Sequence, residues 1–222
     1  FRHSPAMTAA QVLKSKALEM GFSAAGIASV EPLAAVAHYE AWLAAGHHGG
    51  MAYLAGEKHR ARRAHPERIC RDLRAVLVVA LHYEPAREPA RDERLGRIAR
   101  YAAGGDYHHL MKEKLLATER FIRRELFPGS RALWYADTGA ILERGWAVRA
   151  GLGWIGKHSG LLARDRGSWF LLGEVLIDRP LDCDAPLEQE HCGTCTRCID
   201  VCPTRAIIAP YQLDARRCIS YL

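Results

Sequence analysis

The sequence predicts an α/β or α+β fold, in which a domain with a mixed sheet precedes a small cysteine-rich module. Two observations lead to this prediction. Up to about residue 180, short runs rich in Val, Leu and Ile alternate with segments of helical periodicity. After Pro180 the sequence becomes acidic and cysteine-bearing, and no further strand pattern occurs. We therefore place a boundary there, which gives one domain over 8–180 and a second over 181–222.

The N-terminal part of the chain is expected to form a helix, a strand and a second helix in turn. Thr8 is a suitable N-cap for a helix over 9–20, which the following glycine would end. The sequence AAGIASV, residues 24–30, is a short apolar strand candidate. A second helix is expected from Pro32, because proline suits the first turn of a helix, to about Leu43.

The centre of the predicted sheet is the strand RAVLVVALHY, residues 74–83, because dense Val and Leu suit a strand buried on both faces. Residues 106–126 predict an amphipathic helix that ends at Phe-Pro-Gly. Its apolar side recurs at steps of three and four, at Met111, Leu115, Thr118, Ile122 and Leu126. Further strands are expected over 132–137 and in a hairpin that pairs 160–164 with 168–177.

Composition limits the class of protein. The 222 residues are 49% hydrophobic and 25% charged, which is typical of a globular chain able to bury one core. Its apolar runs are shorter than the roughly 18 residues of a membrane span, and none has signal-peptide flanks. We expect a cytoplasmic protein without a membrane, and we exclude the opening FRHSPAM as a leader or engineered remnant. The net charge of +6 permits an anionic partner such as a nucleic acid.

Four cysteines lie within eleven residues, in the sequence HCGTCTRCIDVCP. They are Cys192, Cys195, Cys198 and Cys202. Structural zinc sites usually take two ligands from one loop and two from a distant one, because a single loop cannot easily surround one small ion. The spacing C-x2-C-x2-C-x3-C-P is instead that of bacterial ferredoxins, which bind [4Fe-4S] clusters. The pattern therefore favours an iron–sulfur site over zinc.

The fourth cysteine of such a run ligates a second cluster. Only Cys218 follows Cys202, so the region offers six thiols at most, counting Cys183, where two clusters need eight. Either another group substitutes for the missing cysteines or a C-terminal part is absent, and we prefer the second explanation. Cys70 and Cys183 are isolated, and we expect them to be structural, since a lone thiol usually acts as a small buried hydrophobic group.

A glycine-rich segment, residues 134–158, precedes the cysteines. Its glycines would let the backbone approach a bulky ligand, and Trp146 and Trp154 could pack against it; the alternative is a glycine-rich turn with core tryptophans. Asp137 ends an apolar strand, where a carboxylic acid can have a raised pKa and donate a proton. The alternative for Asp137 is the N-cap of a helix.

Three ordered motifs resemble those of epoxyqueuosine reductases, cobalamin and iron–sulfur enzymes of tRNA queuosine biosynthesis. They are YADTGAILERGWAVRAGLGWIGKH, then GSWFLLGEVLID, then CGTCTRCIDVCPTRAI with LDARRCISYL. The resemblance extends from about Ala10 to the end and includes IARYAAGGDYHHLMKEKL. The family is related to reductive dehalogenases, so fold analogy alone would not fix the substrate.

The resemblance implies reduction of the epoxide of epoxyqueuosine at the wobble position of tRNA. Two electrons would pass through the clusters to cobalt, which would act at the epoxide carbon, while Asp137 donates a proton to the leaving oxygen. One cluster would take Cys192, Cys195 and Cys198, and the second would take Cys202 and Cys218. The family's second cysteine run and its helical-repeat domain are absent from this sequence, which implies a partial ferredoxin-like di-cluster domain.

Cobalamin cannot be inferred from composition. The D-x-H-x-x-G signature of mutase-type cobalamin domains is absent, since Met111 follows Asp106 and His108 where glycine is needed. This suits the base-off binding mode of the family, and would equally suit a protein without cobalamin. Our candidates for cobalamin contacts, besides Asp137, are Arg63, Asp106, Lys157 and Ser159, each of which could instead be a solvated surface residue.

The expected partners are tRNA bearing epoxyqueuosine and an external electron donor such as a flavodoxin or ferredoxin, and the expected state is a monomer. Two alternatives stay open. One is a reductive dehalogenase-like enzyme with a small-molecule substrate, whose tRNA affinity would lack a steep salt dependence. The other is a ferredoxin-like electron carrier, which would contain iron and sulfide but no corrin.

Overall fold

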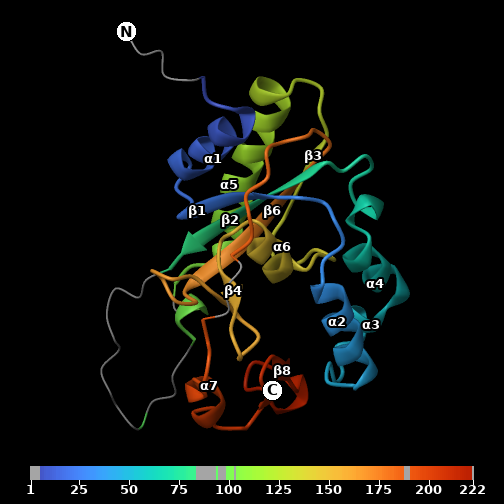
Figure 1. Cartoon of the computed structure of the whole chain (residues 1–222), viewed down its shortest axis with the longest axis vertical. Helices are drawn as coiled ribbons and strands as arrows, with labels where there is room; N and C mark the ends of the chain where they lie inside the picture. The colour runs from blue at the N-terminus through green and yellow to red at the C-terminus, as the bar shows by residue number, and fades with distance from the viewer. Residues whose placement is uncertain (1–5, 84–93, 95–98, 103, 188–190, 222) are drawn as a thin grey trace.

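A four-stranded sheet forms the centre of the computed structural model, which describes residues 6–83, 94, 99–102, 104–187 and 191–221 (Figure 1). The strand order is β1–β2–β6–β3. These strands are β1 (Ala24–Ala28), β2 (Ala75–His82), β3 (Ala132–Tyr135) and β6 (Phe170–Ile177). In this register, Glu174 of β6 lies between Val78 of β2 and Tyr135 of β3. The predicted leader falls mainly on residues 1–5, outside the described residues.

The expected combination of helices and a sheet is confirmed, whereas the pairing within the sheet differs from expectation. All three neighbouring pairs of the four-stranded sheet are antiparallel, where we expected a mixed sheet. A helical connection, as between β2 and β3, is typical of parallel strands. These two strands do run in the same direction, but β6 is inserted between them and runs in the opposite direction.

Helices cover both faces of the sheet (Figure 1). On one face, α1 (Ala9–Glu19) and α5 (Tyr107–Phe121) bury a cluster that includes Leu13, Leu77 and Leu115. On the other face, α6 (Glu143–Arg149) buries Trp146 against Val76 and Val78. Because successive side chains of β2 point to opposite faces, Ala75 to Ala80 are buried on both. The prediction of a central, two-sided strand is confirmed.

Gly26 lets α6 approach the sheet closely. A Cβ atom at this position would lie 2.2 Å from the carbonyl oxygen of Ala150, the C-cap residue of α6. The missing side chain therefore sets the distance between β1 and the end of the helix.

The two main helices of the first layer follow the sequence pattern. Thr8 caps α1 in a capping box with Gln11. Asp106 caps α5, because its side chain accepts a hydrogen bond from the N–H of His108. At its other end the helix continues into a π-helical turn, Ile122–Leu126. Four of the predicted apolar positions are fully buried, and Leu126 packs at the edge of the core.

Two other expectations need correction. The second helix, α2 (Ala35–Ala44), begins three residues after Pro32, and it is followed by α3 (Ala52–Ala55) and α4 (Glu57–Ala64), which have no clear periodicity. The predicted hairpin is wrong: β5 (Leu161–Leu162) pairs with β4 (Trp154–Ile155), not with β6. Only Ala163 and Gly167 form a bridge at the predicted turn. The long strand β6 instead fills the space between β2 and β3, where it buries both faces.

The segment after β6 runs along the β1 edge and leads to the cysteine-rich module. The Asp184 N–H donates to the Ile27 carbonyl at 2.8 Å, and the Asp184 carboxylate accepts from the Ile27 N–H and from Lys14. The module then forms α7 (Arg197–Asp200) and the pair β7 (Ile207–Ala209) and β8 (Gln212–Leu213). The boundary near residue 180 stays a prediction.

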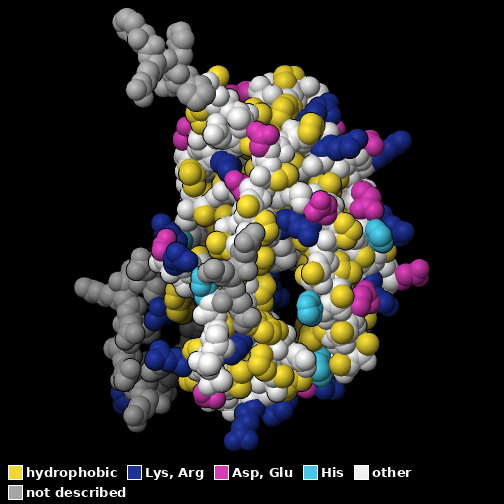
Figure 2. Space-filling view, in the orientation of Figure 1, with side chains coloured by type: hydrophobic (Ala, Val, Ile, Leu, Met, Phe, Trp, Pro, Cys, Tyr) yellow, Lys and Arg dark blue, Asp and Glu magenta, His cyan; other side chains and the backbone are white. Residues whose placement is uncertain are grey.

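The module docks on the segment of α2 and α3. The indole of Trp42 donates to the Leu213 carbonyl at 2.6 Å, and the Tyr221 hydroxyl accepts from the Gly50 N–H at 2.7 Å. Short 3₁₀ turns complete the fold at Pro66–Arg68, Arg100–Ala102 and Ala215–Arg217. In the space-filling view of Figure 2, the surface has a hollow above the module. In the same orientation, Figure 1 shows α6 and α2 on its two sides. Among the described residues, no helix has the length and apolarity to cross a bilayer.

Candidate functional site

Asp137 lies in a strained loop directly after β3. Its φ angle is +54°, in the left-handed region that side chains other than glycine adopt rarely. Its backbone N–H donates to Oε1 of Glu143 at 2.6 Å, which ties the loop to the first turn of α6. Because α6 begins only at Glu143, with Leu142 at its N-cap, Asp137 does not cap this helix. Strain of this kind often accompanies functional sites.

Tyr107, at the start of α5, donates its hydroxyl hydrogen to Oδ2 of Asp137. Burial, followed by the hydrogen bond to Asp137, raises the pKa of Tyr107 well above its ordinary value. The phenol therefore stays protonated and acts as a donor to the carboxylate. The ring of Tyr101 meets Tyr107 edge-on, with centroids 6.2 Å apart.

His108 connects two carboxylates at the N-terminal end of α5. Its Nδ1 lies 2.7 Å from Oδ1 of Asp106, and its Nε2 lies 3.5 Å from Oδ2 of Asp137. The imidazole stacks on the ring of Tyr107, with centroids 4.2 Å apart. Backbone and side-chain hydrogen bonds from His108 lower the pKa of Asp106, which keeps that carboxylate ionised.

Two further acids lie behind Asp137. Burial raises the pKa of Glu143 to about 7, and the charge of Asp137 acts in the same direction. Glu174 is completely buried on the sheet face that α6 covers, and neither carboxyl oxygen has a hydrogen-bond partner among the described residues. Burial, and then the charges of Glu143 and Asp137, raise the pKa of Glu174 well above its ordinary value. The site thus contains an exposed acid above two increasingly buried ones.

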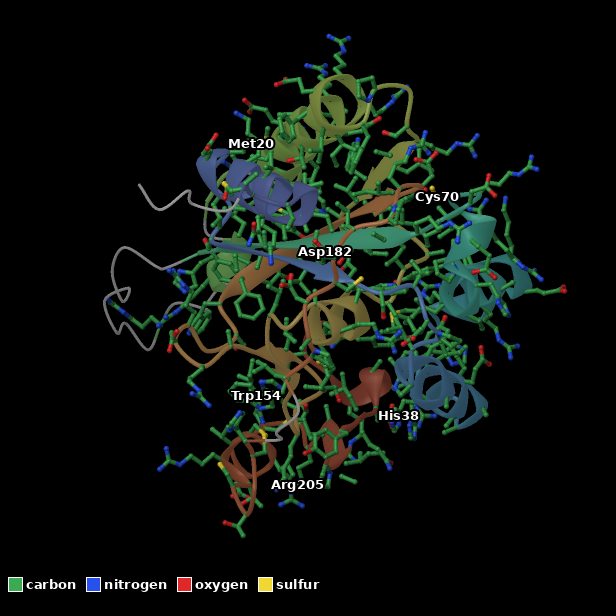
Figure 3. All side chains as sticks on the ribbon, turned by 45° about the horizontal axis from the view of Figure 1, so that its top comes forward. Met20, His38, Cys70, Trp154, Asp182 and Arg205 are labelled. Carbon is green, nitrogen blue, oxygen red and sulfur yellow. The ribbon has the colours of Figure 1, made fainter. Side chains whose placement is uncertain are left out.

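The cysteine segment is held against the main domain by Lys157. The Lys157 ammonium donates to the carbonyls of Gly193, at 2.6 Å, and Cys195, at 3.1 Å, and the Lys157 carbonyl accepts from the Tyr211 N–H at 2.9 Å. Figure 3 shows Trp154 at the end of the molecule that carries Arg205, and Trp154 packs edge-on against His191. The sequence candidate Lys157 therefore lies at the junction of the two parts of the chain.

The five candidate metal ligands are free thiols on or beside α7 and the strands that follow it. They are Cys192, Cys195, Cys198, Cys202 and Cys218. Backbone N–H groups of Ile207 and Ala206 lower the pKa of Cys202, which favours the thiolate that metals bind. Within the described ranges, no three His, Cys, Asp or Glu side chains are close enough to hold a single ion. The donor set fits iron in its chemistry and spacing, since thiolates are the ligands of iron–sulfur clusters.

The candidates for cobalamin contacts differ in their surroundings. Arg63 is buried, packs over Tyr39 and lines a cavity of about 340 Å³ together with Trp146. Its Nη1 and the Ser159 Oγ are buried without hydrogen-bond partners among the described residues. Asp106 is occupied by its own helix. Unpartnered buried donors of this kind fit a polar-edged ligand such as a corrin, so Arg63 and Ser159 are the better of the four candidates.

The remaining sequence candidates are core or surface residues. Trp146 and Cys70 are buried, as the structural alternative predicted for each. Figure 3 shows Cys70 beside α4, away from the cysteine-rich module. Cys183 is exposed, so its predicted burial is wrong. The linker that contains it lies on the outside of the β1 edge rather than beneath it.

Comparisons with known proteins address the same two regions. The family description "Epoxyqueuosine reductase QueG, DUF1730" matches residues 63–138, and "4Fe-4S double cluster binding domain" matches residues 191–222. An epoxyqueuosine reductase of Cyclobacterium marinum is 39% identical over 96% of this chain and 68% of its own length. The chain belongs to the epoxyqueuosine reductase family.

Epoxyqueuosine reductase of Xanthomonas campestris pv. campestris is 44% identical over the whole of this chain. The chain spans 62% of that relative and 59% of the one from Pseudomonas aeruginosa, so it covers about three fifths of their length.

Solved epoxyqueuosine reductases share the fold. One, crystallised with an epoxyqueuosine-modified tRNA stem loop, superimposes with a TM-score of 0.85 at 30% identity, over 95% of this chain and 56% of its own. Another, from Bacillus subtilis, has its catalytic aspartate loop swung out of the active site, with a TM-score of 0.84 at 28% identity over the same shares. A reductive dehalogenase matches at 0.55 and 19% identity, over 98% of this chain and 25% of its own, which shows a related fold alone.

Four site residues were missed in the sequence: Tyr107, His108, Glu143 and Glu174. Tyr107 and His108 directly follow a helix cap, a common arrangement without a functional signal. Glu174 did carry a signal, since it is a lone acid within the apolar strand FLLGEVLI.

Proposed function

We propose that this chain is the redox part of an epoxyqueuosine reductase, which reduces the epoxide of epoxyqueuosine in tRNA to the alkene of queuosine. The observation that supports this most is the strained Asp137 loop, with its phenol and imidazole neighbours, in the same chain as a ferredoxin-type cysteine run. Neither feature alone would define the reaction. Together they support a molecule in which an acid would protonate the leaving oxygen and a cluster site would supply electrons.

The reaction consumes two electrons and two protons. The two C–O bonds of the epoxide break, a C=C bond forms and the oxygen leaves as water. The electrons come from an external donor such as a flavodoxin or ferredoxin, while the protons must come through groups of the protein. Proton donation to the oxygen avoids the formation of a free alkoxide.

The cofactors are assigned to the two parts of the chain. Cys192, Cys195 and Cys198 would hold one [4Fe-4S] cluster, and Cys202 and Cys218 would contribute to a second. Arg63 and Ser159 would contact cobalamin through the unpartnered donors described above. When bound, the clusters would supply electrons and cobalamin would supply the strongly reducing centre that opens the epoxide.

The side chains around Asp137 prepare it for proton transfer. Its carboxyl group carries the proton to the leaving oxygen, while the Tyr107 hydroxyl fixes the orientation of Oδ2. Glu143 holds the loop through the Asp137 N–H. In the Bacillus subtilis relative the catalytic aspartate loop is swung out of the active site, which supports two positions for this loop. The bond between Glu143 and the Asp137 N–H would favour the position inside the site.

The proposed macromolecular partner is tRNA, in agreement with the relative crystallised with a modified stem loop. The net charge of +6 suits a polyanion. The proposed setting is the cytoplasm, where tRNA is modified, and the proposed state is a monomer. Binding to tRNA should weaken steeply as salt increases, which would separate this function from that of a small-molecule dehalogenase.

Replacement of Asp137 by Asn tests the proposal. The full-length protein is loaded with clusters and cobalamin, supplied with a chemical reductant, and assayed by mass spectrometry for loss of epoxyqueuosine from tRNA. Asp137→Asn keeps the shape and tolerates the left-handed backbone, but it cannot donate a carboxylic proton, so turnover should fall by about 100-fold or more.

Asp72→Asn is the matched control, because Asp72 is also an aspartate with positive φ, at +61°, on the surface. This variant should keep wild-type turnover. Full activity of Asp137→Asn, or no conversion by a wild-type enzyme that carries both cofactors, would contradict the proposal.

A further inference from the structure

The proposed reaction needs a second proton that Asp137 cannot supply by itself. A carboxylic acid holds one proton, whereas release of the epoxide oxygen as water takes two. After the first transfer, Asp137 is a carboxylate and has to be protonated again within the same turnover. A protein group that can return a proton to the Asp137 carboxylate would meet this need.

His108 is the described group best placed for this path. Its Nε2 lies 3.5 Å from Oδ2 of Asp137, and its side chain is 46% exposed, so the imidazole contacts both the acid and the solvent. Its Nδ1 lies 2.7 Å from Asp106, whose side chain is 54% exposed. Imidazole can both donate and accept a proton through its ring nitrogens, which is why histidine is a common proton carrier in proteins.

The other groups that face Asp137 are less suitable. The raised pKa of Tyr107 keeps its proton on the phenol. The Glu143 carboxyl is engaged with the Asp137 backbone rather than with the Asp137 side chain. Glu174 is completely buried and cannot exchange protons directly with water. His108 is the one of these four groups with both a short distance to the Asp137 carboxyl and an exposed side chain.

We propose that His108 returns a proton to Asp137 during each turnover, and that Asp106 orients the imidazole for this transfer. This inference rests on the proposed function. In the step, the Nε2–H bond of the imidazolium breaks and an O–H bond forms on Asp137. The neutral imidazole then takes a proton from water, so no oxidant or reductant is required. His108 acts through Asp137, whereas Asp137 acts on the substrate.

The Asp106 contact gives the imidazole a defined orientation. A carboxylate that accepts from Nδ1–H fixes the ring with Nε2 on the side of Asp137, 3.5 Å from Oδ2, in the way that a second carboxylate fixes histidine in other proton-transfer sites. The stacking of Tyr107 on His108 restricts rotation of the ring. The hydroxyl of the same Tyr107 holds Oδ2, the acceptor oxygen. Donor and acceptor are therefore positioned by one side chain.

The test compares His108→Ala with His109→Ala, both in the full-length, cofactor-loaded enzyme. His109 is the neighbouring exposed histidine on α5, and its side chain forms no hydrogen bond or ion pair with Asp137 among the described residues. His108→Ala should lower kcat by about tenfold or more, with little change in the KM for tRNA. His109→Ala should match wild type.

Chemical rescue distinguishes proton delivery from a structural role. Added imidazole should restore much of the kcat of His108→Ala, because the vacated exposed position admits a small base, whereas it should not restore Asp137→Asn. His108→Gln, which retains a polar side chain of similar size, serves as the second variant should the alanine variant unfold. It should show the same loss of kcat.

Two outcomes would overturn the inference while the proposed function stands. One is wild-type kcat for His108→Ala and His108→Gln in dilute buffer. The other is a loss that imidazole does not restore, which would indicate a structural role. A wild-type enzyme without any turnover would contradict the proposed function, and the inference with it.

Discussion

Glu174 is the least expected residue of the molecule. It lies on the central part of the sheet, between Val78 and Tyr135, with both carboxyl oxygens buried and unpartnered among the described residues. An ionised carboxylate in such surroundings would be very unfavourable, so the side chain folds as the neutral acid. The raised pKa of Glu174 follows from this burial, with added repulsion from Glu143 and Asp137.

Stability should therefore fall as pH rises above the unfolded-state pKa of glutamate, about 4.3. In that range the folded chain holds more protons than the unfolded chain, which makes the slope of unfolding free energy against pH negative. Glu143, with a pKa of about 7, contributes in the same direction up to that pH. Glu174→Gln removes one of the two groups, so its melting temperature should depend less on pH.

The measurement is thermal unfolding at pH 5 and pH 8 for wild type, Glu174→Gln and a control. Glu19→Gln is a suitable control, since Glu19 is an exposed acid at the end of α1. It should keep the wild-type difference between the two pH values. An equally large difference in Glu174→Gln would show that Glu174 is not held in its neutral form.

Asp137 was a candidate from the sequence because it follows an apolar strand, but this pattern left an N-cap open, and the role of proton donor came from the resemblance to epoxyqueuosine reductases. Glu143, Tyr107 and His108 could not be found in this way. Their roles depend on contacts between α5, the loop after β3 and α6, which are brought together only in the folded chain. The sequence therefore indicated Asp137 as a candidate, but not the residues that contact it.

At the scale of the elements, the closest approach of a helix to the sheet depends on Gly26. An added methyl group would lie 2.2 Å from the Ala150 carbonyl oxygen, and backbone on both sides leaves little room to adjust. Gly26→Ala should therefore lower the free energy of unfolding by about 1–3 kcal/mol, as overpacking of a core does.

Urea unfolding of Gly26→Ala and Gly104→Ala would measure this effect. A Cβ atom at Gly104 would meet no atom within 4 Å, so the control variant should be as stable as wild type. Equal stability of the two variants would mean that α6 can move away from β1 without cost.

The predictable elements are those with a strong period or a distinct cap. The start of α1 at its Thr8 cap, the core positions of α5 and the two-sided burial of β2 follow directly from the sequence pattern. The position of β6 does not, because a short connection after 160–164 suggested a hairpin. Between the edges of β2 and β3, β6 pairs with a strand on each side, whereas the two-residue strand β5 could pair with it over two residues at most. Short α3 and α4 have too few residues to show a period.

At the scale of the whole molecule, the cysteine-rich module is joined to the rest of the chain at two places. Lys157 holds the loop that contains Cys195, and the α2–α3 segment holds Leu213 and Tyr221. Clusters bound by the module would thus be kept at a fixed distance from the main domain by these contacts as well as by the linker.

The number of thiols limits what this chain can hold. Two complete cubane clusters need eight thiolates, and the described C-terminal region has six cysteines, of which exposed Cys183 lies outside the ferredoxin-type run. We therefore expect that reconstitution of residues 1–222 with iron and sulfide gives fewer than eight irons per chain, in labile clusters.

Cys198→Ser should reduce the iron content further, because it removes one of the three ligands of the first cluster, whereas Cys183→Ser should leave it unchanged. Iron and sulfide analysis after gel filtration, together with the thiolate-to-iron charge-transfer absorbance, would measure the cluster content of the wild-type chain and of both variants. Stable binding of eight irons, or equal losses in the two variants, would contradict the assignment of Cys192, Cys195 and Cys198 to one cluster and of Cys202 to another.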